Sequence, residues 1–341
     1  MKRHLIPVFC GVLLLAGWSV IQANAQGTAQ SHVATAKAAA YAPGQDFTAV
    51  FETLCEEPKP GQTGARPPDK NPLPLPTAPR SEWFVEPAKV FDNLYYIGSK
   101  DDSSWAITTS AGIIMIDTGF QYSIEELAAN GLKKLGLDPA NIKYVIVSHA
   151  HSDHYLGAKF IQDRYKTRII LSEADWNVIA NDYYPASAKP KKDMVATDGM
   201  KLTLGDTTLT LYVTPGHTPG TVSTLIPLKD GNQTHLGSIW GGMTFGFERA
   251  GVRYFPTLND ALRTNAAQAR RYQGIAERAG ADVFLSIHTR HDKTPEKIAA
   301  VKARKPGAPH PFVSKEAIKR HLTVIAECSD AQLAWRAKGT N

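Results

Sequence analysis

The chain has 341 residues, of which 43% are hydrophobic and 21% charged, and its 38 basic residues outnumber 32 acidic ones. This composition is ordinary for a soluble globular enzyme, and the length suits one large domain or at most two. The dense basic stretches, Lys189–Lys192 and Lys302–Lys305, are broken by proline or alanine and contain no aromatic residue. We therefore interpret them as solvated faces and expect no nucleic-acid partner, although the positive balance is compatible with a modest preference for anionic substrates.

The first 25 residues have the order of a secretory signal peptide. Lys2-Arg3-His4 precedes the apolar stretch Leu5–Ile21, and Ala23-Asn24-Ala25 then offers small residues for cleavage. We expect cleavage after Ala25 and a mature protein in the periplasm or outside the cell, with no stable membrane association. The alternative is an uncleaved membrane anchor, because the apolar stretch is near the lower length limit for a transmembrane helix.

Residues 26–80 are interpreted as a flexible, proline-rich N-terminal arm. Residues 26–45 are rich in Ala, Gln and Ser, and eight prolines between 58 and 79 make regular structure implausible there. One short helix is expected at Phe47–Cys55. Cys55 and Cys328 remain in the mature chain. In an oxidising compartment they could pair, and the alternative is two buried free thiols.

Residues 81–341 are assigned to one domain in which strands and helices alternate. Strands are expected at 90–97, 105–109, 112–116, 143–148 and 168–171, within 201–227, and at 234–241 and 282–287. Helices are expected at 123–135, 154–165, 173–180, 260–279 and 294–304 and near the C-terminus, with a loop at 182–193. This order fits an α/β fold of two mixed sheets flanked by helices, a four-layer αββα sandwich.

The segment His149-Ala150-His151-Ser152-Asp153-His154 directly follows the apolar run Tyr144–Val147. A strand that ends in such a cluster presents ligands, and neutral imidazole and carboxylate are the groups that zinc takes. Ligands from a strand end and from a helix start divide more naturally between two ions than around one. The alternative is a histidine-rich surface loop that binds metal only adventitiously.

Two later histidines also follow predicted strands. His217 lies in the turn-forming segment Thr214–Gly220 after the alternating strand 209–213, and His288 ends the apolar run 282–287. Each alone is more often a hydrogen-bonded loop residue. Three strands that each end in histidine, however, predict a convergent site at one edge of the sheets.

These motifs resemble those of the metallo-β-lactamase superfamily. The resemblance covers roughly residues 81–336 and includes the segments Asn93–Gly98 and Ile113–Gly119. It is closest to the third subclass of class B (zinc) β-lactamases, which the chain resembles in Trp83, Trp105 and the long helix near the C-terminus. The resemblance implies two Zn²⁺ ions per chain, the first held by His149, His151 and His217 and the second by Asp153, His154 and His288.

The resemblance also implies a mechanism. Two zinc ions would share a water molecule and lower its pKa, so that hydroxide attacks the strained amide of a β-lactam. Asp153 would be both a ligand and the catalytic residue that orients the nucleophile. Asp117 resembles a residue that accepts a hydrogen bond from the second ring nitrogen of a ligand histidine and so fixes that ring. The alternative is a turn-forming Asp before Thr118-Gly119.

The stretch Ile239–Phe245 departs from the superfamily pattern. Glyoxalase-type hydrolases, lactonases and RNA-processing members of the superfamily carry a bridging Asp between the last two histidines, where this chain has Met243. A thioether is a poor zinc ligand beside imidazole and carboxylate, so we interpret Met243 as an apolar wall residue, with ligation the alternative. The missing Asp argues against thioesterase, lactonase and nuclease chemistry.

The same stretch lacks two hydroxyl groups. Typical third-subclass enzymes place hydroxyls at the positions of Met243 and Phe245 to bind the β-lactam carboxylate. Thr244 is one substitute, and a cation after the last ligand is another, with the candidates Arg290, His291 and Lys293. The alternative for these three residues is that they face solvent.

The sequence suggests three possible functions. The leading hypothesis is a secreted di-zinc hydrolase that opens the amide ring of β-lactam antibiotics, with a small molecule as its substrate. The second is a zinc hydrolase of the same fold that acts on a lactone, ester or other small amide, which the missing hydroxyls favour. The third, a non-catalytic metal-binding protein, is disfavoured because all six predicted ligands are present.

Overall fold

The computed structural model describes residues 28–59, 75–249 and 251–337. The predicted signal peptide and most of the proline-rich stretch lie outside these residues. Among the described helices, none has the length and apolar character needed to cross a membrane.

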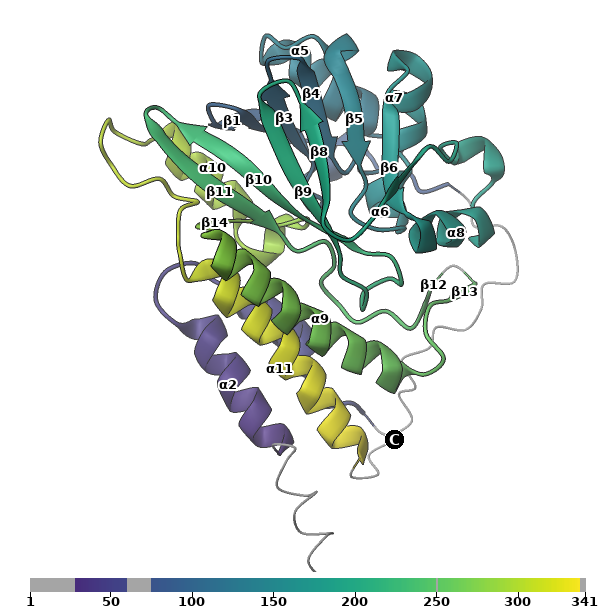
Figure 1. Ribbon diagram of the computed structural model, residues 1–341, viewed down its shortest axis with the longest axis vertical. Coiled ribbons are helices and arrows are strands. Elements are labelled where there is room, and N and C mark those ends of the chain that lie inside the picture. Colours follow the sequence, from purple (N-terminus) through teal and green to yellow (C-terminus); the bar gives the residue numbers. More distant parts are fainter. Residues whose placement is uncertain (1–27, 60–74, 250, 338–341) are drawn as a thin grey trace, which may run out of the picture.

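Two mixed sheets form the centre of the fold, with helices on both outer sides (Figure 1). The first sheet contains, in spatial order, β1 (Ala88–Phe91), β2 (Leu94–Tyr96), β3 (Trp105–Thr109), β4 (Gly112–Ile116), β5 (Ile142–Ile146), β6 (Arg168–Ser172) and β7 (Met194–Ala196). The second contains β14 (Val283–Leu285), β11 (Gln233–Ile239), β10 (Val222–Asp230), β9 (Thr207–Val213) and β8 (Met200–Leu204). β4 to β7 run parallel, as do β11 and β14, while the other neighbours are antiparallel.

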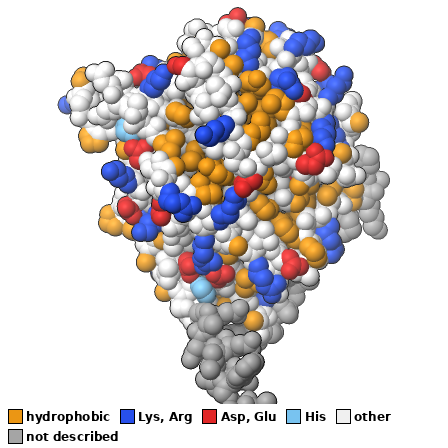
Figure 2. Space-filling view, in the orientation of Figure 1, with side chains coloured by type: hydrophobic (Ala, Val, Ile, Leu, Met, Phe, Trp, Pro, Cys, Tyr) orange, Lys and Arg blue, Asp and Glu red, His pale blue; other side chains and the backbone are white. Residues whose placement is uncertain are grey.

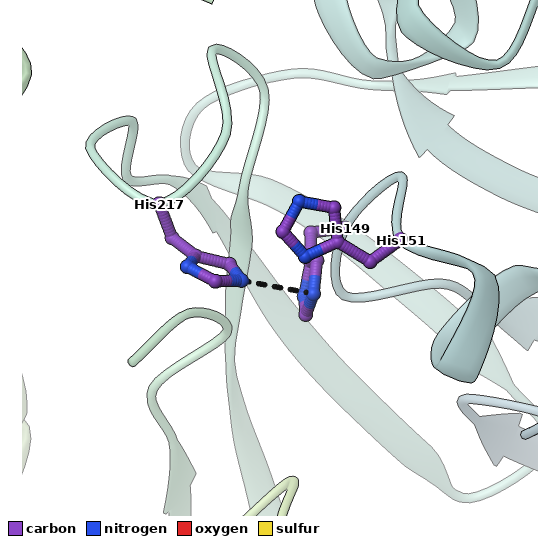
Figure 3. A group of neighbouring side chains, drawn as sticks. All are labelled: His149, His151 and His217. Atoms are coloured by element: carbon purple, nitrogen blue, oxygen red, sulfur yellow. Dashed lines mark hydrogen bonds between the residues drawn. The ribbon is translucent and has the colours of Figure 1, made fainter. Parts of the chain in front are cut away.

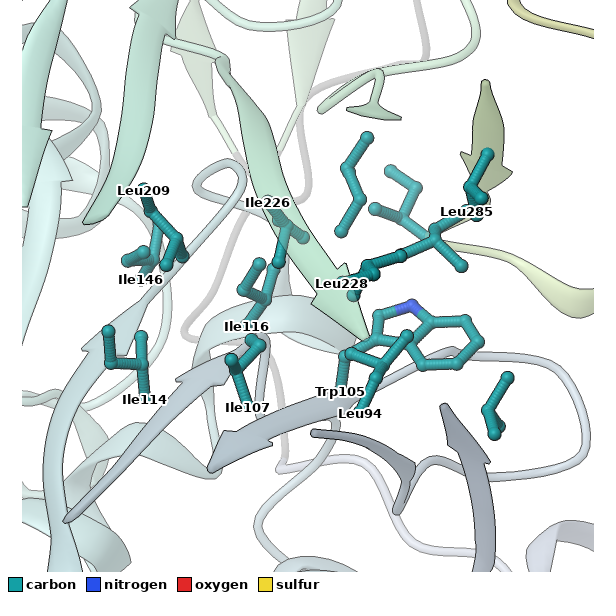
Figure 4. Close-up of a cluster of buried hydrophobic side chains, with 14 of the residues drawn as sticks. Leu94, Trp105, Ile107, Ile114, Ile116, Ile146, Leu209, Ile226, Leu228 and Leu285 are labelled. Carbon is teal, nitrogen blue, oxygen red and sulfur yellow. The ribbon is translucent and has the colours of Figure 1, made fainter. Parts of the chain in front are cut away.

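The core between the sheets is made of branched aliphatic side chains around Trp105 (Figure 4). Trp105 is fully buried, and its indole N–H donates to the carbonyl of Ser286, 3.1 Å away, on the segment that follows β14. In β4, Ile114 and Ile116 face this core, whereas Ile113 and Met115 face the helices on the other side. Both faces of the strand are therefore buried, which explains its continuous apolar sequence.

Helices complete four layers, which confirms the predicted αββα fold. The first sheet is covered by α5 (Gly131–Lys134), α7 (Ala158–Tyr165) and α8 (Glu173–Asn181), and the second by α9 (Leu258–Ala279) and α11 (Ala317–Ala337). Further helices are α4 (Arg80–Trp83), α6 (Ser152–Tyr155) and α10 (Thr294–Lys302). On the face in Figure 2, Lys and Arg side chains are dispersed among Asp and Glu.

Three predicted elements differ in detail. The strand expected at 90–97 is two strands, because Asn93 in the turn bonds to the backbone of Pro227 and Lys229 in β10. The helix expected at 154–165 is divided at Gly157, where a Cβ would lie 2.5 Å from the carbonyl oxygen of Thr118. The helix expected at 123–135 begins with a π-helical turn at Glu125–Asn130.

The prediction of a flexible segment is wrong for residues 28–45, whereas the short helix expected at Phe47–Cys55 is confirmed. The helices α2 (Ala29–Tyr41) and α3 (Thr48–Leu54) pack against α11, as Figure 1 shows for α2. Small side chains such as Ala36 and Ala40 are buried there, so the alanine-rich composition allows close approach of the helices. The guanidinium of Arg320 in α11 donates to the carbonyl groups of Ala39, Ala42 and Pro43 at the C-terminal end of α2, where a helix leaves carbonyls without intrahelical partners.

A disulfide joins Cys55 to Cys328, so the two cysteines pair and are not free thiols. The bond ties the end of α3 to the middle of α11 across 273 residues of sequence. Closing a loop of this length restricts the unfolded chain, which stabilises the folded state.

We predict that replacing both cysteines by serine lowers the free energy of unfolding by about 2–5 kcal/mol. Urea unfolding of the variant and of the wild-type protein, with and without a reducing agent, measures this loss. Reduced wild-type protein should match the variant, and an unchanged midpoint in both would contradict the prediction.

His321 in α11 links the N-terminal helices to the second sheet. Its ring is buried between Phe47 and Phe284, with centroid distances of 5.3 and 4.4 Å, and its Nδ1 has no hydrogen-bond partner. Burial, with the charge of Lys297, lowers the pKa of His321 from 6.5 to about 3. The folded state therefore binds the proton less well than the unfolded state does, and it loses stability as the pH falls below 6.5.

We predict that His321 contributes a decrease of up to about 1.4 kcal/mol in unfolding free energy for each pH unit below 6.5. The variant His321→Leu should show a shallower pH dependence than the wild-type protein between pH 7 and 5. Denaturant unfolding at several pH values measures both curves, and parallel curves would show that His321 does not titrate in this range.

Candidate metal centre

The predicted ligands lie at the carboxyl ends of strands from both sheets. His149 and His151 are in the loop after β5, and Asp153 and His154 are in α6, which begins at Ser152. His217 lies between β9 and β10, and His288 follows β14. The structure brings all six side chains together in two groups, each of which offers ligand atoms within 4.8 Å of one another.

The first group consists of His149, His151 and His217, whose rings face one another (Figure 3). Their ring centroids lie 4.4 to 4.6 Å apart, and the Nε2 atoms of His149 and His217 are separated by 3.1 Å. All three side chains are buried. His151 has no hydrogen-bond partner at either ring nitrogen, although its ring lies beside that of Tyr254.

The second group consists of Asp153, His154 and His288. The Nε2 atoms of the two histidines are 3.3 Å apart, and Oδ2 of Asp153 lies 3.5 and 3.9 Å from them. The other carboxylate oxygen, Oδ1, has no hydrogen-bond partner. The ring centroids of His149 and His154 are 4.0 Å apart, so the two groups are adjacent.

Four of the imidazoles are oriented in the same way, by a hydrogen bond at Nδ1. His149 donates to the carbonyl of Gly241 (2.8 Å) and His217 to that of Thr244 (2.6 Å). His154 donates to Asp117 (2.8 Å), and His288 donates to Asp102 (3.1 Å). These bonds hold each ring so that its Nε2 points into the site, which is typical of metal-binding histidines.

The donor set fits zinc. Burial holds the pKa of His149 and of His151 well below its ordinary value and lowers that of His217 to about 3, so these imidazoles are neutral, as ligation requires. Burial also opposes charge on His154, but Asp117 and Asp153 outweigh it and raise the pKa of His154 to about 10. The first group thus offers neutral nitrogen ligands, and the second favours a positive charge.

A third group of possible ligands lies on the surface between α2 and α11. His32 pairs with Glu327 at 2.6 Å, and Arg270 pairs with both Glu327 and Asp330. The guanidinium already neutralises these carboxylates, so we interpret the group as an ion-pair cluster.

Asp117 has the role that the sequence suggested. It adopts a left-handed backbone conformation, with φ of 59°, directly after β4. Its carboxylate accepts from His154 and also from the backbone N–H (2.6 Å) and the hydroxyl (2.8 Å) of Ser148. It therefore joins the loop that carries His149 to the helix that carries His154.

Asp175, near the start of α8, was missed by the sequence analysis. Its buried carboxylate accepts from Ala150 N–H, Gly220 N–H and the Thr218 hydroxyl, each at 2.8 Å. Burial outweighs these bonds and raises the pKa of Asp175 to about 6. Asp175 thus connects the loops of His151 and His217, and only its position after the N-capping Ser172 marks it in the sequence.

Around the ligands, the apolar wall residue is where the sequence predicts it, but the nearby cation is a different residue. Met243 is buried in the apolar cluster between the second sheet and α9 and α11, as expected of an apolar wall residue. Lys293 pairs with Asp46 at 2.6 Å, and Arg290 donates to His291, so neither is shown to point toward the site. The cation beside the ligands is instead Arg249, whose Nη2 lies 3.8 Å from Oδ1 of Asp153.

Comparisons with known proteins relate the chain to one superfamily and its fold. Residues 101–230 match the family model of the metallo-beta-lactamase superfamily. The structure is similar to BJP-1, a subclass B3 metallo-β-lactamase of Bradyrhizobium japonicum, with a TM-score of 0.63 and 29% identity over 75% of this chain and 97% of that one. The native FEZ-1 metallo-β-lactamase from Legionella gormanii gives a TM-score of 0.60 and 26% identity over 78% and 97%.

Curated sequence relatives have other activities. The N-acyl homoserine lactonase AttM of Agrobacterium fabrum is 36% identical over 109 residues, which are 29% of this chain and 41% of that protein. The hydroxyacylglutathione hydrolase of Acidiphilium cryptum is 26% identical over 126 residues, 37% of this chain and 44% of that protein. The matches to these relatives span less than half of their lengths.

We predict that Asp117→Asn lowers the affinity for zinc about 10- to 100-fold, because an amide holds the His154 imidazole less well than a carboxylate does. Asparagine tolerates the left-handed backbone of this position, so the fold should be retained. Competition with a chromophoric chelator measures the affinity. Asp163→Asn, an exposed aspartate that pairs with Lys159, is the control, and equal affinities in the two variants would contradict the role of Asp117.

Proposed function

The chain carries a domain of the metallo-β-lactamase superfamily, and we propose that it is an exported di-zinc hydrolase that opens the amide ring of β-lactam antibiotics. The family match and the structural neighbours support a hydrolase of this superfamily. Zinc, the β-lactam substrate and export are the parts that we propose.

The observation that carries the proposal is the composition of the site. Three histidines form one group, and one aspartate with two histidines forms the other. The position where lactonases and glyoxalase-type members have a bridging Asp holds Met243, which is 4% exposed and packs into the apolar cluster under α9 and α11. A site without that carboxylate matches the pattern expected of third-subclass β-lactamases.

Zinc at the two groups would lower the pKa of water toward neutrality and polarise the carbonyl of the substrate. The protein's own residues prepare this chemistry. The hydrogen bonds at Nδ1 hold four imidazoles in place before any ligand binds. Oδ1 of Asp153 has no hydrogen-bond partner and would be available to orient the attacking water.

Export is supported by the disulfide. Cys55 and Cys328 are paired, and such bonds persist in oxidising compartments such as the periplasm. The order of residues 1–25 independently favours secretion.

A lactone is the second candidate substrate. The match to AttM favours it, as does the absence of hydroxyl groups at Met243 and Phe245. The same zinc chemistry would cleave a lactone ester, so the two candidates differ only in how the substrate is bound.

We predict that the mature protein, beginning at Gln26, hydrolyses nitrocefin or benzylpenicillin with a kcat/KM at least about 100-fold above that for an N-acyl homoserine lactone. A chelator should abolish this activity and added zinc should restore it, with two zinc ions per chain in the active sample. Spectrophotometric assays and metal analysis of one preparation give these values.

His151→Ala should be inactive, because it removes a predicted ligand of the first zinc. His32→Ala is the matched control, since His32 lies in the surface ion-pair cluster and its loss should leave the rate unchanged. Faster hydrolysis of the lactone than of either β-lactam would replace the proposal with the second candidate.

A further inference from the structure

We propose that Arg249 is the residue that selects substrates with a carboxylate next to the bond that is cleaved. The inference deepens the proposed function and rests on it. Arg249 lies in a hairpin beside the site and is far in sequence from all six predicted ligands. In this proposal it recognises the anionic group of the substrate.

Arg249 lies at the edge of the second ligand group. It belongs to the short hairpin of β12 (Glu248–Arg249) and β13 (Val252–Arg253). Its Nη2 is 3.8 Å from Oδ1 of Asp153, which is too long for a hydrogen bond. The side chain is 42% exposed, so the guanidinium has donors that can reach a molecule in solution.

The hairpin is held in place by contacts at both ends. Gly246 N–H donates to the carbonyl of Gly216, beside His217, and Tyr254 N–H donates to that of Phe247. Tyr254 also lies beside the His151 ring, with 5.9 Å between centroids. At the tip, a Cβ on Gly251 would lie 2.0 Å from Cζ of Tyr183, so the hairpin is in close contact with the loop at 182–193.

The charges around Arg249 favour an anion from outside the protein. Asp153 is the only carboxylate paired with Arg249 within the described residues, and as a predicted ligand its charge would be directed toward a cation. Arg249 would then stand beside positive charge without a partner of its own. A substrate carboxylate would supply one, and the planar guanidinium can bind it through two parallel hydrogen bonds.

Other groups are less suited to this role. Lys293 is paired with Asp46, and Lys189 is paired with Asp182 at 2.7 Å. Met243 and Phe245 have no hydroxyl to offer. Arg290, which the sequence suggested, is exposed and donates to His291, and no contact with the ligand groups is observed for it in the described part of the chain.

The test compares an acid with its ester. The kcat/KM of the zinc-loaded protein is measured for benzylpenicillin and for benzylpenicillin methyl ester, which differ only in the carboxylate. Arg249→Ala should reduce the value for the acid about 10- to 100-fold, mainly through KM, and leave that for the ester nearly unchanged. Arg249→Lys keeps the positive charge but cannot make two parallel hydrogen bonds. Its kcat/KM for benzylpenicillin should therefore lie between the values of the wild-type protein and Arg249→Ala.

Arg290→Ala is the matched control and should leave the acid-to-ester ratio at the wild-type value. An equal effect of Arg249→Ala on acid and ester, or a loss of the preference for the acid in Arg290→Ala, would overturn the assignment. The first result would show that Arg249 acts only on the stability of the site, and the second would return the role to Arg290.

A binding measurement separates this inference from the proposed function. Calorimetry compares ring-opened penicilloate with penicilloate esterified only at the carboxylate that benzylpenicillin already carries, and it reports recognition of that carboxylate without turnover. If neither penicillin is hydrolysed but penicilloate binds and Arg249→Ala weakens its binding, the substrate assignment fails while the role of Arg249 stands. If wild-type protein does not bind penicilloate more tightly than its ester, the role of Arg249 fails.

Discussion

The arrangement of the site depends on hydrogen bonds made by Nδ1 of the imidazole rings, the nitrogen that faces away from the site. Four of the six predicted ligands donate at Nδ1, two to backbone carbonyls and two to aspartates. The Nε2 atoms of His149 and His217 are therefore 3.1 Å apart, and those of His154 and His288 are 3.3 Å apart. Two nitrogen lone pairs at such a spacing in a buried place favour a proton or a cation between them. One metal ion at each group, as we propose, would satisfy this constraint.

The fold brings the hydrogen-bond acceptors of the ligand imidazoles together from segments that are far apart in sequence. Gly241 and Thr244 follow β11, and this segment packs through Trp240 and Met243 into the cluster that also contains Leu54 and Cys55. The N-terminal helices and the disulfide therefore support the same stretch of backbone that orients His149 and His217. On the other side, Asp117 and Asp175 connect the loops that carry His149, His151, His154 and His217.

Charge distinguishes the two ligand groups and their surroundings. The first group is neutral and deeply buried, whereas the second contains Asp153 and contacts Asp117 and Asp102. Arg249 stands at the open edge of this negative region. A cation at the second group would change the balance, because it would engage Asp153 and leave the guanidinium to bind an anion. In this proposal, substrate recognition and metal binding would be linked through the carboxylate of Asp153.

The sequence by itself determined the six candidate ligands and the layered fold. His149, His151, Asp153 and His154 are adjacent in the chain, and the apolar runs before them, before His217 and before His288 are long enough to read as strands. Local spacing and strand pattern carry that information. The pairing of Cys55 with Cys328 was left open, because two cysteines 273 residues apart give no local signal.

Only the tertiary structure decided which groups orient and surround the ligands. The carbonyls of Gly241 and Thr244 are backbone atoms that every residue has, so no residue type marks them. Asp175 and Arg249 come close to the ligands through contacts between loops, at 21 and 95 residues beyond His154. The alanine-rich helix α2 looks unstable when considered alone, and it is its burial against α11 that makes it part of the domain.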